Sequence, residues 1–234
     1  MRALFAKHRA ESRILLIFLA LSGGLLLLGK AASEVIEGDT LAFDRAVLLF
    51  LRNSSDPAIP IGPLWLRQVM VDVTALGSVA VLTIITTLAA GYLVAAKKPM
   101  LASFMVGAVA GGALISTLLK QAYARARPDI VAHLVGTDSA SFPSGHAMNS
   151  AVTFLTLAVL LARAEKSVAV RRYLISIAIG LTLVIGFSRL YLGVHWPTDV
   201  AAGWIVGALW AAGCSLWAKR LQSHHTIEEA GTSP

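Results

Sequence analysis

The 234-residue sequence has few charged residues, because Asp, Glu, Lys and Arg make up only 14% of it while 56% is apolar. A soluble domain carries about 25% charged residues, so this chain has too little charge to cover a water-facing surface. The single cysteine, Cys214, excludes an internal disulfide and a small disulfide-stabilised scaffold. The same composition excludes a disordered or collagen-like chain. With a mean hydropathy of +0.72, the sequence predicts an all-α, polytopic membrane protein.

Long uncharged runs predict a bundle of six transmembrane helices, since a spanning helix needs about 20 apolar residues. The expected spans lie at 14–28, 73–96, 99–119, 147–162, 173–188 and 200–218. The first run has an alternative, because basic residues precede it and a short small-residue segment follows, as in a cleaved signal peptide. We favour an uncleaved helix, since Lys30 stands where a cleavage site prefers small neutral residues.

The net charge of +7 is compatible with nucleic-acid binding, but a membrane protein needs basic cytoplasmic segments as orientation signals. With the N-terminus inside, the inner segments hold twelve of the 20 basic residues, and the outer segments hold nine of the 13 acidic ones. The sequence therefore predicts that both termini are cytoplasmic. We expect no nucleic-acid partner, and the sequence does not indicate protein partners.

The 40-residue segment between the first two spans predicts an additional outer-side helix, because apolar residues alternate with Asp44, Arg45 and Arg52 around 41–52. This interfacial helix either forms a platform for a lipid or merely covers the bundle. Residues 1–221 are expected to form one membrane domain, followed by a polar C-terminal tail at 222–234. Two Gly-xxx-Gly pairs, at 107/111 and 203/207, predict close helix packing.

Three clusters of polar residues stand at span ends that the predicted topology places on the outer side of the membrane. They are Lys120-x6-Arg127-Pro128, Pro143-Ser144-Gly145-His146, and Ser188-Arg189-x5-His195-x3-Asp199. Charges near hydrocarbon are costly unless they are paired, and the connecting loop has too few acids to pair these cations. A shared anionic ligand explains them together, since Arg and Lys both bind phosphate oxygens.

Neutral groups add to this predicted anion site. The backbone amides that open the fourth span point at any anion placed there, and Gly145 allows close approach. Ser144 either caps the helix or donates its hydroxyl to an oxyanion. Arg125, two residues before Arg127, is a candidate contact for a second phosphate, with a solvated or lipid-facing side chain as the alternative.

The two histidines indicate chemistry at that site. His146 and His195 can each act as a nucleophile or a proton donor, and Asp199 lies four residues after His195, where it can fix the imidazole tautomer. Zinc binding is the alternative, but a zinc site wants three or four converging ligands and no surrounding positive charge. We therefore expect neither a metal nor another cofactor.

These residues resemble the three-part signature of the type 2 phosphatidic acid phosphatase superfamily, which also includes vanadium haloperoxidases and soluble acid phosphatases. The signature occupies residues 120–199, and every defining position matches. The resemblance implies that His195 attacks phosphorus to form a phosphohistidine, that Asp199 orients it, and that His146 protonates the leaving group. It further implies that Lys120, Arg127, Ser144, Gly145 and Arg189 hold the phosphoryl oxygens.

The resemblance implies a metal-independent lipid phosphatase of the bacterial inner membrane with its active site facing the periplasm. Undecaprenyl diphosphate and glycerolipid phosphates (phosphatidic acid or phosphatidylglycerol phosphate) are the expected substrates. A lipid A phosphatase or a lipid phosphotransferase with the same site is an alternative. From another class, an anion or lipid transporter would bind phosphate without reacting, although paired histidines are surplus to that role.

Overall fold

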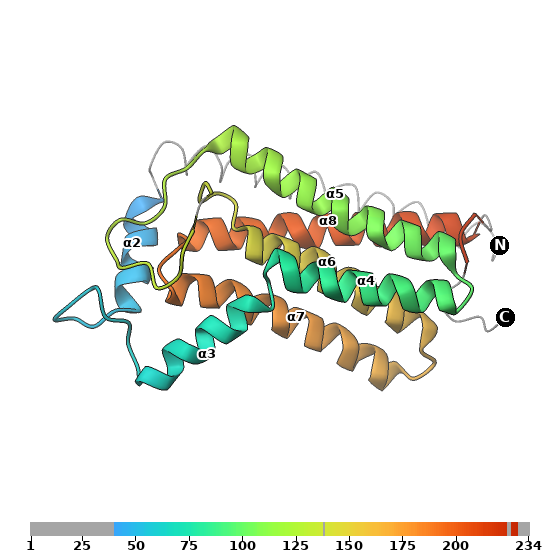
Figure 1. The fold of residues 1–234 in the computed structure, drawn as a ribbon, viewed down its shortest axis with the longest axis horizontal. Helices are drawn as coiled ribbons and strands as arrows, with labels where there is room; N and C mark the ends of the chain where they lie inside the picture. Colours follow the sequence, from blue (N-terminus) through green and yellow to red (C-terminus); the bar gives the residue numbers. More distant parts are fainter. Residues whose placement is uncertain (1–39, 138, 224–225, 229–234) are drawn as a thin grey trace, which may run out of the picture. The chain divides into compact units, whose positions relative to one another are not determined.

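The computed structural model describes residues 40–137, 139–223 and 226–228, and this part of the chain contains seven helices and no strand. The predicted first span at 14–28, with its signal-peptide alternative, lies outside the described residues. The helices are α2 (Leu41–Phe50), α3 (Leu64–Ala75), α4 (Val79–Ala95), α5 (Pro99–Tyr123), α6 (Gly145–Ala164), α7 (Val168–Tyr191) and α8 (Pro197–Ser223). Figure 1 shows α5, α6, α7 and α8 running side by side.

Four of these helices, α5 to α8, are long and apolar enough to cross a membrane, and the pair α3 and α4 makes a fifth if it is one bent span. Four of the spans predicted from the sequence thus appear at α5 to α8, each a few residues longer than expected. The six-span prediction is not confirmed, because the described residues contain four or five.

The span predicted at 73–96 is not one continuous helix, because it includes the end of α3 and all of α4. The axes of α3 and α4 meet at 48°. Ser78 explains the break, because its extended backbone starts a new helix and its hydroxyl accepts a hydrogen bond from the Val81 amide at 3.3 Å. Hydropathy alone does not register this change, since the residues on both sides of Ser78 are apolar.

Helix α6 lies between α7 and α8, and its packing on α8 depends on the predicted glycines. A Cβ atom at Gly203 would lie 2.7 Å from the Ser144 carbonyl oxygen, and one at Gly207 would lie 2.6 Å from that of Met148. This confirms close packing for the 203/207 pair. The 107/111 pair behaves differently, because Gly111 packs against Trp210 while no atom of the described residues lies within 4 Å of a Cβ at Gly107.

The predicted helix around 41–52 is present as α2, but its polar residues are not all turned outward. Asp44 is fully buried and Arg52 is 4% exposed, whereas Phe43 and Phe50 are 61% and 79% exposed. The alternation of apolar and charged residues therefore does not separate a buried face from an exposed one. The Asp44 carboxylate points into the bundle, and Phe43 and Phe50 form an exposed apolar surface.

Residues 226–228, which belong to the predicted C-terminal tail, pack on the bundle. Ile227 is buried against Leu101 and Leu160 at the end where α5 begins. The Glu228 carboxylate accepts hydrogen bonds from the Met100 and Leu101 amides at 3.2 and 2.9 Å. Both amides belong to the first turn of α5, so Glu228 supplies the cap that the sequence around Pro99 lacks.

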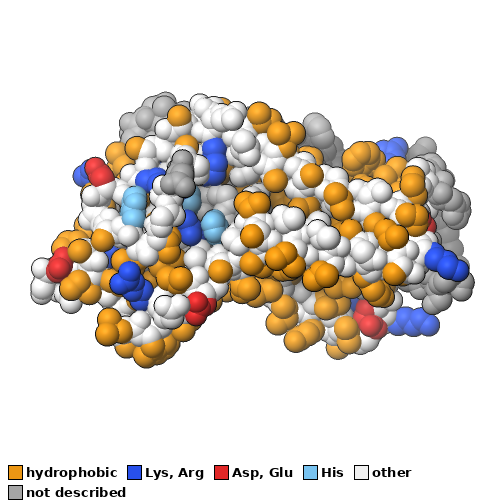
Figure 2. Space-filling view, viewed as in Figure 1, with side chains coloured by type: hydrophobic (Ala, Val, Ile, Leu, Met, Phe, Trp, Pro, Cys, Tyr) orange, Lys and Arg blue, Asp and Glu red, His pale blue; other side chains and the backbone are white. Residues whose placement is uncertain are grey.

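The helix directions bring the three polar clusters to one end of the bundle. Lys120 lies in the last turn of α5, His146 in the first turn of α6, and Arg189 in the last turn of α7. His195 precedes α8, which begins at Pro197. Figure 2 shows Lys, Arg and His side chains around a hollow at this end, while apolar side chains dominate the long helices.

Candidate active site

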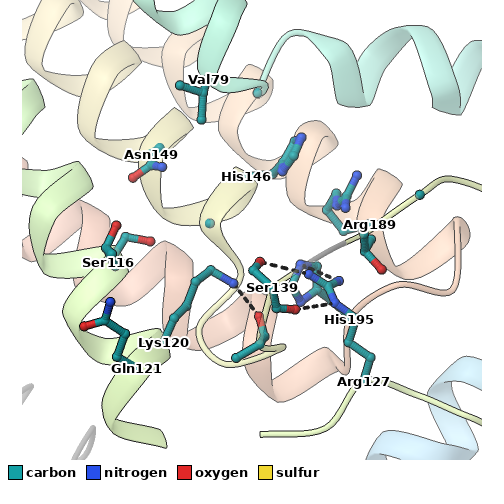
Figure 3. Close-up of a pocket in the computed structure, with 16 residues that line it drawn as sticks. Val79, Ser116, Lys120, Gln121, Arg127, Ser139, His146, Asn149, Arg189 and His195 are labelled. Carbon is teal, nitrogen blue, oxygen red and sulfur yellow. Dashed lines mark hydrogen bonds between the residues drawn. The ribbon is translucent and has the colours of Figure 1, made fainter. Parts of the chain in front are cut away.

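A pocket of about 640 Å³ opens at the end of the bundle where the three clusters meet. Helices α4, α5, α6 and α7 and the loops before α6 and α8 contribute to it (Figure 3). Six residues predicted for the site line this pocket, namely Lys120, Arg127, Gly145, His146, Arg189 and His195. The structure thus brings together residues that lie up to 75 positions apart in the sequence.

Neutral oxygen atoms hold the three cations of the pocket. Lys120 donates to the Ala140 carbonyl at 2.6 Å, and Arg189 donates to the Thr74 hydroxyl at 3.0 Å. Arg127 donates to the carbonyls of Ser139 and Val194 at 2.8 and 2.5 Å. These oxygen atoms fix the three side chains around the pocket, and three positively charged groups at one pocket are suited to a multiply charged anion.

His195 is almost completely buried, at 1% exposure, in the turn between α7 and α8. Its Nε2 atom lies 3.4 Å from the Arg127 guanidinium, and its Nδ1 atom lies 3.5 Å from the Asp199 carboxylate. A carboxylate at Nδ1 places the ring proton there, so Nε2 carries the lone pair on the pocket side, where the Arg127 guanidinium contacts it.

The ionisation of His195 favours the same role. Burial lowers its pKa from 6.5 to about 4, and the Arg127 and Arg189 charges act in the same direction against the opposing effect of Asp199. The imidazole is therefore neutral near pH 7, which is the form that a nucleophile requires.

The turn that presents His195 depends on Gly193, whose φ of +74° lies in the left-handed region. A Cβ atom there would also lie 2.6 Å from the Arg52 guanidinium and 2.7 Å from the Ala132 carbonyl oxygen. Only glycine combines that conformation with that close approach. Burial lowers the pKa of Arg52, whose Nη1 atom donates to the Tyr191 carbonyl at 3.0 Å.

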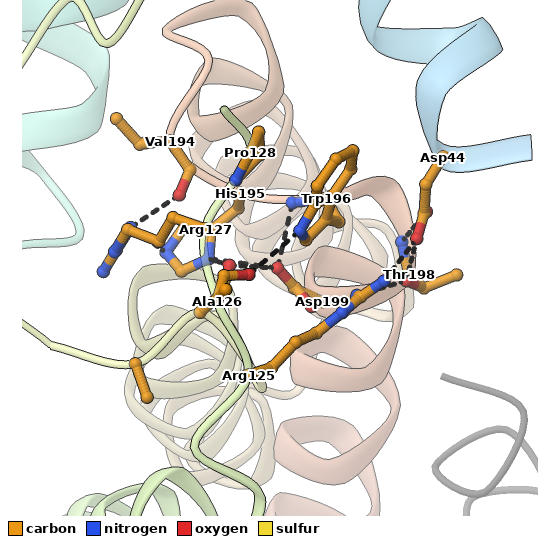
Figure 4. A network of polar contacts seen from close by, with 12 residues as sticks. Asp44, Arg125, Ala126, Arg127, Pro128, Val194, His195, Trp196, Thr198 and Asp199 are labelled. Carbon is orange, nitrogen blue, oxygen red and sulfur yellow. Dashed lines mark hydrogen bonds and ion pairs between the residues drawn. The ribbon is translucent and has the colours of Figure 1, made fainter. Parts of the chain in front are cut away.

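Asp199 is fully buried behind His195 and binds several donors (Figure 4). Its Oδ2 atom accepts from the Trp196 amide at 2.9 Å and from the Ser141 hydroxyl at 2.5 Å. Its Oδ1 atom accepts from Arg125 at 2.6 Å. The carboxylate is thereby fixed in one orientation relative to the Nδ1 atom of His195.

Ser144 stands at the N-cap position of α6, but its side chain makes no capping hydrogen bond. Its Oγ atom is buried and has no hydrogen-bond partner within the described protein. Of the two uses predicted for this hydroxyl, capping is therefore absent. Gly145 follows, and a Cβ atom at that position would lie 3.4 Å from Cε of Lys120, so the glycine keeps the pocket open beside the lysine.

His146 faces the pocket from the first turn of α6, near the break between α3 and α4. A Cβ atom at Gly77 would lie 3.3 Å from its imidazole ring and 2.5 Å from Ile185. The bend before α4 therefore leaves space for the imidazole ring of His146. The ring of His133 contacts the Pro128 carbonyl oxygen at 2.7 Å.

Arg125 does not line the pocket, in contrast to its prediction as a contact for a second phosphate. Its guanidinium forms ion pairs with Asp44 and Asp199 at 2.8 and 2.6 Å, and its side chain is only 11% exposed. The solvated alternative is equally inconsistent with that burial. The two carboxylates hold it on the far side of Asp199 from the pocket.

Sequence reasoning missed a neutral polar wall made by Ser116, Gln121 and Asn149, which lies beside Lys120 in Figure 3. Ser116 and Gln121 belong to α5, while Asn149 lies one turn after Gly145 in α6. The i and i+4 spacing of Gly145 and Asn149 was a usable signal, because it puts both on one helix face. Ser141 and Asp44 had no such signal, since both lie in segments without a motif.

Three comparisons relate this chain to known proteins. The model of the "PAP2 superfamily" matches residues 101–223. Phosphatidylglycerophosphatase B of Bacillus subtilis is 33% identical over 156 residues, which cover 66% of this chain and 76% of that protein. An undecaprenyl-diphosphatase of Sulfolobus acidocaldarius is 35% identical over 71 residues, covering 29% of each chain.

The fold has a counterpart among solved structures. The crystal structure of a transmembrane PAP2-type phosphatidylglycerolphosphate phosphatase from Bacillus subtilis superposes with a TM-score of 0.75 at 26% identity. The match covers 87% of this chain and 98% of that one. The similarity therefore includes the helices outside the 120–199 signature as well as the helices that carry it.

Proposed function

Because this chain belongs to the PAP2 superfamily, we propose that it is a membrane phosphatase that hydrolyses a lipid phosphate through a phosphohistidine on His195. The observation that carries this proposal is the position of the His195 imidazole. Its Nδ1 atom faces Asp199, and its Nε2 atom faces a pocket lined by three cations. An imidazole held this way carries its lone pair on Nε2, directed at the place where we propose that a phosphoryl group binds.

In the first step, Nε2 of His195 attacks phosphorus and the bond from phosphorus to the lipid oxygen breaks. The leaving alkoxide takes a proton from His146, so the lipid departs as an alcohol. Lys120, Arg127 and Arg189 stabilise the charge on the equatorial phosphoryl oxygens. The unused Ser144 hydroxyl supplies a further donor to those oxygens.

In the second step, water attacks the phosphohistidine and His146 accepts a proton from it. The bond between phosphorus and Nε2 breaks, and inorganic phosphate leaves with neutral His195 restored. Asp199 stabilises the positive charge that the imidazole carries while it is phosphorylated. This chemistry needs no metal, and three fixed cations already occupy the place that a divalent ion would take.

For the substrate we propose a glycerolipid phosphate, with phosphatidylglycerol phosphate first. The support is the relationship to a phosphatidylglycerophosphatase over 76% of that protein's length. The neutral wall of Ser116, Gln121 and Asn149 suits the hydroxyl-bearing glycerol that links lipid and phosphate in this substrate. Undecaprenyl diphosphate is the second candidate, favoured by the three pocket cations, since a diphosphate carries more charge than a monoester.

We further propose that this is a bacterial inner-membrane protein with cytoplasmic termini, whose pocket faces the periplasm. The excess of basic residues in the segments opposite the pocket supports this orientation. A lipid phosphate whose acyl chains lie in the bilayer would place its headgroup at the level of the pocket.

The test is phosphate release by the detergent-purified protein in the presence of EDTA. The substrates are phosphatidylglycerol phosphate, phosphatidic acid and undecaprenyl diphosphate. We expect release from the wild type that is unaffected by EDTA and is abolished in His195→Asn. With ³²P-labelled substrate, we expect a phosphoenzyme that survives alkali and is lost in acid, as a phosphohistidine is.

The matched control is His133→Gln, which replaces a histidine that contacts a backbone carbonyl outside the pocket. Its activity should stay within about threefold of the wild type. Release that persists in His195→Asn would contradict the nucleophile assignment, and loss of release on adding EDTA would contradict the metal-free reaction. Equal rates on all three lipids would contradict the substrate preference.

A further inference from the structure

The interfacial helix α2 is connected to the active site through charged side chains that lie outside the pocket. Asp44 of α2 is fully buried, although a buried carboxylate is costly unless it is paired. Its Oδ2 atom lies 2.8 Å from the Arg125 guanidinium, and Arg125 also contacts Asp199 at 2.6 Å. One arginine therefore bridges two buried carboxylates.

Thr198 closes this network at the start of α8. Its amide donates to Oδ1 of Asp44 at 3.0 Å, and its hydroxyl lies 2.8 Å from Oδ2 of Asp44. The Arg125 guanidinium donates to the same hydroxyl at 2.8 Å and lies 5.5 Å from the ring centre of Trp196. Thr198 and Trp196 lie on either side of Pro197, where α8 begins. The network therefore holds the N-terminus of α8, which carries Asp199, in place (Figure 4).

The charges in this network leave a defined balance beside the nucleophile. Asp44 and Asp199 carry two negative charges and Arg125 one positive charge, so one negative charge remains. A phosphorylated imidazole is positively charged, and the remaining negative charge close to Nδ1 stabilises it. With Asp44 absent, Arg125 would neutralise Asp199 alone, and the stabilisation of the phosphohistidine would weaken.

We propose that Asp44 and Arg125 are positioning residues for the phosphatase reaction, holding Asp199, and through it His195, in the orientation for attack. This inference rests on the proposed function. The network also gives α2 a defined role, since the helix supplies a carboxylate to the active-site support as well as covering the bundle. Neither residue lines the pocket, so the effect is on the reaction step and not on phosphate binding.

The test is the steady-state kinetics of Arg125→Ala and Asp44→Asn on phosphatidylglycerol phosphate and on the soluble monoester p-nitrophenyl phosphate. We expect Arg125→Ala to lower kcat about 100-fold at a KM within twofold of the wild type, as for a catalytic group displaced by about 1 Å. Asp44→Asn should lower kcat about tenfold, because it changes the charge balance but keeps the shape. Guanidinium ion, but not methylammonium at equal concentration, should restore part of the activity of Arg125→Ala.

The matched control is Arg163→Ala at the opposite end of the bundle. Arg163 is another partly buried arginine, and it donates to the Ser215 hydroxyl at 2.8 Å and to Gln222 at 3.1 Å. This variant should lose thermal stability while its kcat stays within twofold. Such a result would show that loss of a structural arginine does not by itself lower kcat.

The outcomes separate the two proposals. An active wild type whose kcat is unchanged in Arg125→Ala would overturn the positioning role alone, and so would a rise in KM without a fall in kcat. A wild type that releases no phosphate from either substrate would contradict the proposed function as well. If Arg125→Ala does not fold, Arg125→Lys replaces it, because lysine keeps the charge but cannot bridge both carboxylates. An unchanged kcat in Arg125→Lys and in Asp44→Asn would overturn the proposal.

Discussion

Replacing Asp199 by asparagine tests whether this carboxylate sets the protonation of His195. The carboxylate uses its two oxygens differently, with Oδ1 accepting from Arg125 and Oδ2 accepting from Trp196 and Ser141. An amide has one oxygen and one NH2 group. Either Arg125 or the Trp196 and Ser141 pair must therefore lose its acceptor. The structure therefore offers the asparagine no orientation that satisfies every donor.

The two orientations affect His195 differently, and the one that keeps the amide oxygen on Arg125 changes its tautomer. If the amide oxygen faces Arg125, the NH2 group faces Nδ1 of His195, which must then accept, and the ring proton moves to Nε2. If the amide is reversed, its NH2 group faces the Arg125 guanidinium and the ion pair is lost. A nucleophile held in the wrong tautomer loses about 10³- to 10⁴-fold in kcat. That loss corresponds to about 4–5.5 kcal/mol in the activation free energy.

The assay is phosphate release from phosphatidylglycerol phosphate at pH 7 by wild type and Asp199→Asn, with thermal unfolding of both in the same detergent. Because Arg125 keeps Asp44 as a partner, we expect a loss of unfolding free energy of only about 1–3 kcal/mol, so the variant should still fold. A folded variant with a kcat less than tenfold below the wild type would refute the reasoning, because the tautomer would then not depend on Asp199.

Three further predictions concern stability and selectivity. His195 is protonated below about pH 6.5 in the unfolded chain but only below about pH 4 in the folded protein, so the stability should fall as the pH falls through that window. We expect the difference in melting temperature between the wild type and His195→Asn to decrease as the pH is lowered from about 7.5 to about 4.5. A difference that stays constant would contradict this prediction. Gly203→Val should reduce stability by about 3 kcal/mol in thermal unfolding, because its Cβ would meet a backbone oxygen at 2.7 Å. Gly107→Ala should not, because within the described part of the chain no atom lies within 4 Å of a Cβ at that position, and equal losses would count against the packing argument. Asn149→Leu should lower kcat/KM about tenfold for phosphatidylglycerol phosphate and less than threefold for phosphatidic acid, which lacks the linking glycerol. An equal loss on both lipids would argue against binding of the glycerol headgroup by the polar wall.

The membrane class and most spans are readable from the sequence because they depend on local composition. Helices α5 to α8 begin and end within a few residues of the expected runs, since a charged or proline-containing segment limits each of them. The break at Ser78 could not be predicted from local composition. A helix can bend within an apolar run without any change in hydropathy, and only the capping hydrogen bond marks the place.

Several residues of the pocket were also predictable, because chemistry restricts which residue types can bind phosphate and attack it. Lys120, Arg127, His146, Arg189 and His195 line the pocket as their residue types suggested. Their convergence follows from antiparallel helices of similar length, which return each cluster to the same end of the bundle. The sequence order alone therefore placed these functional groups near one another.

The tertiary structure decided which side chains surround that set. Asp44 and Arg125 lie 81 positions apart, and no local pattern links an acid on a short surface helix to an arginine in a loop. Their pairing depends on where α2 packs against α8, which is a property of the assembled core. The sequence alone determines which residue types are present for catalysis. Long-range packing decided which other residues hold those side chains in place.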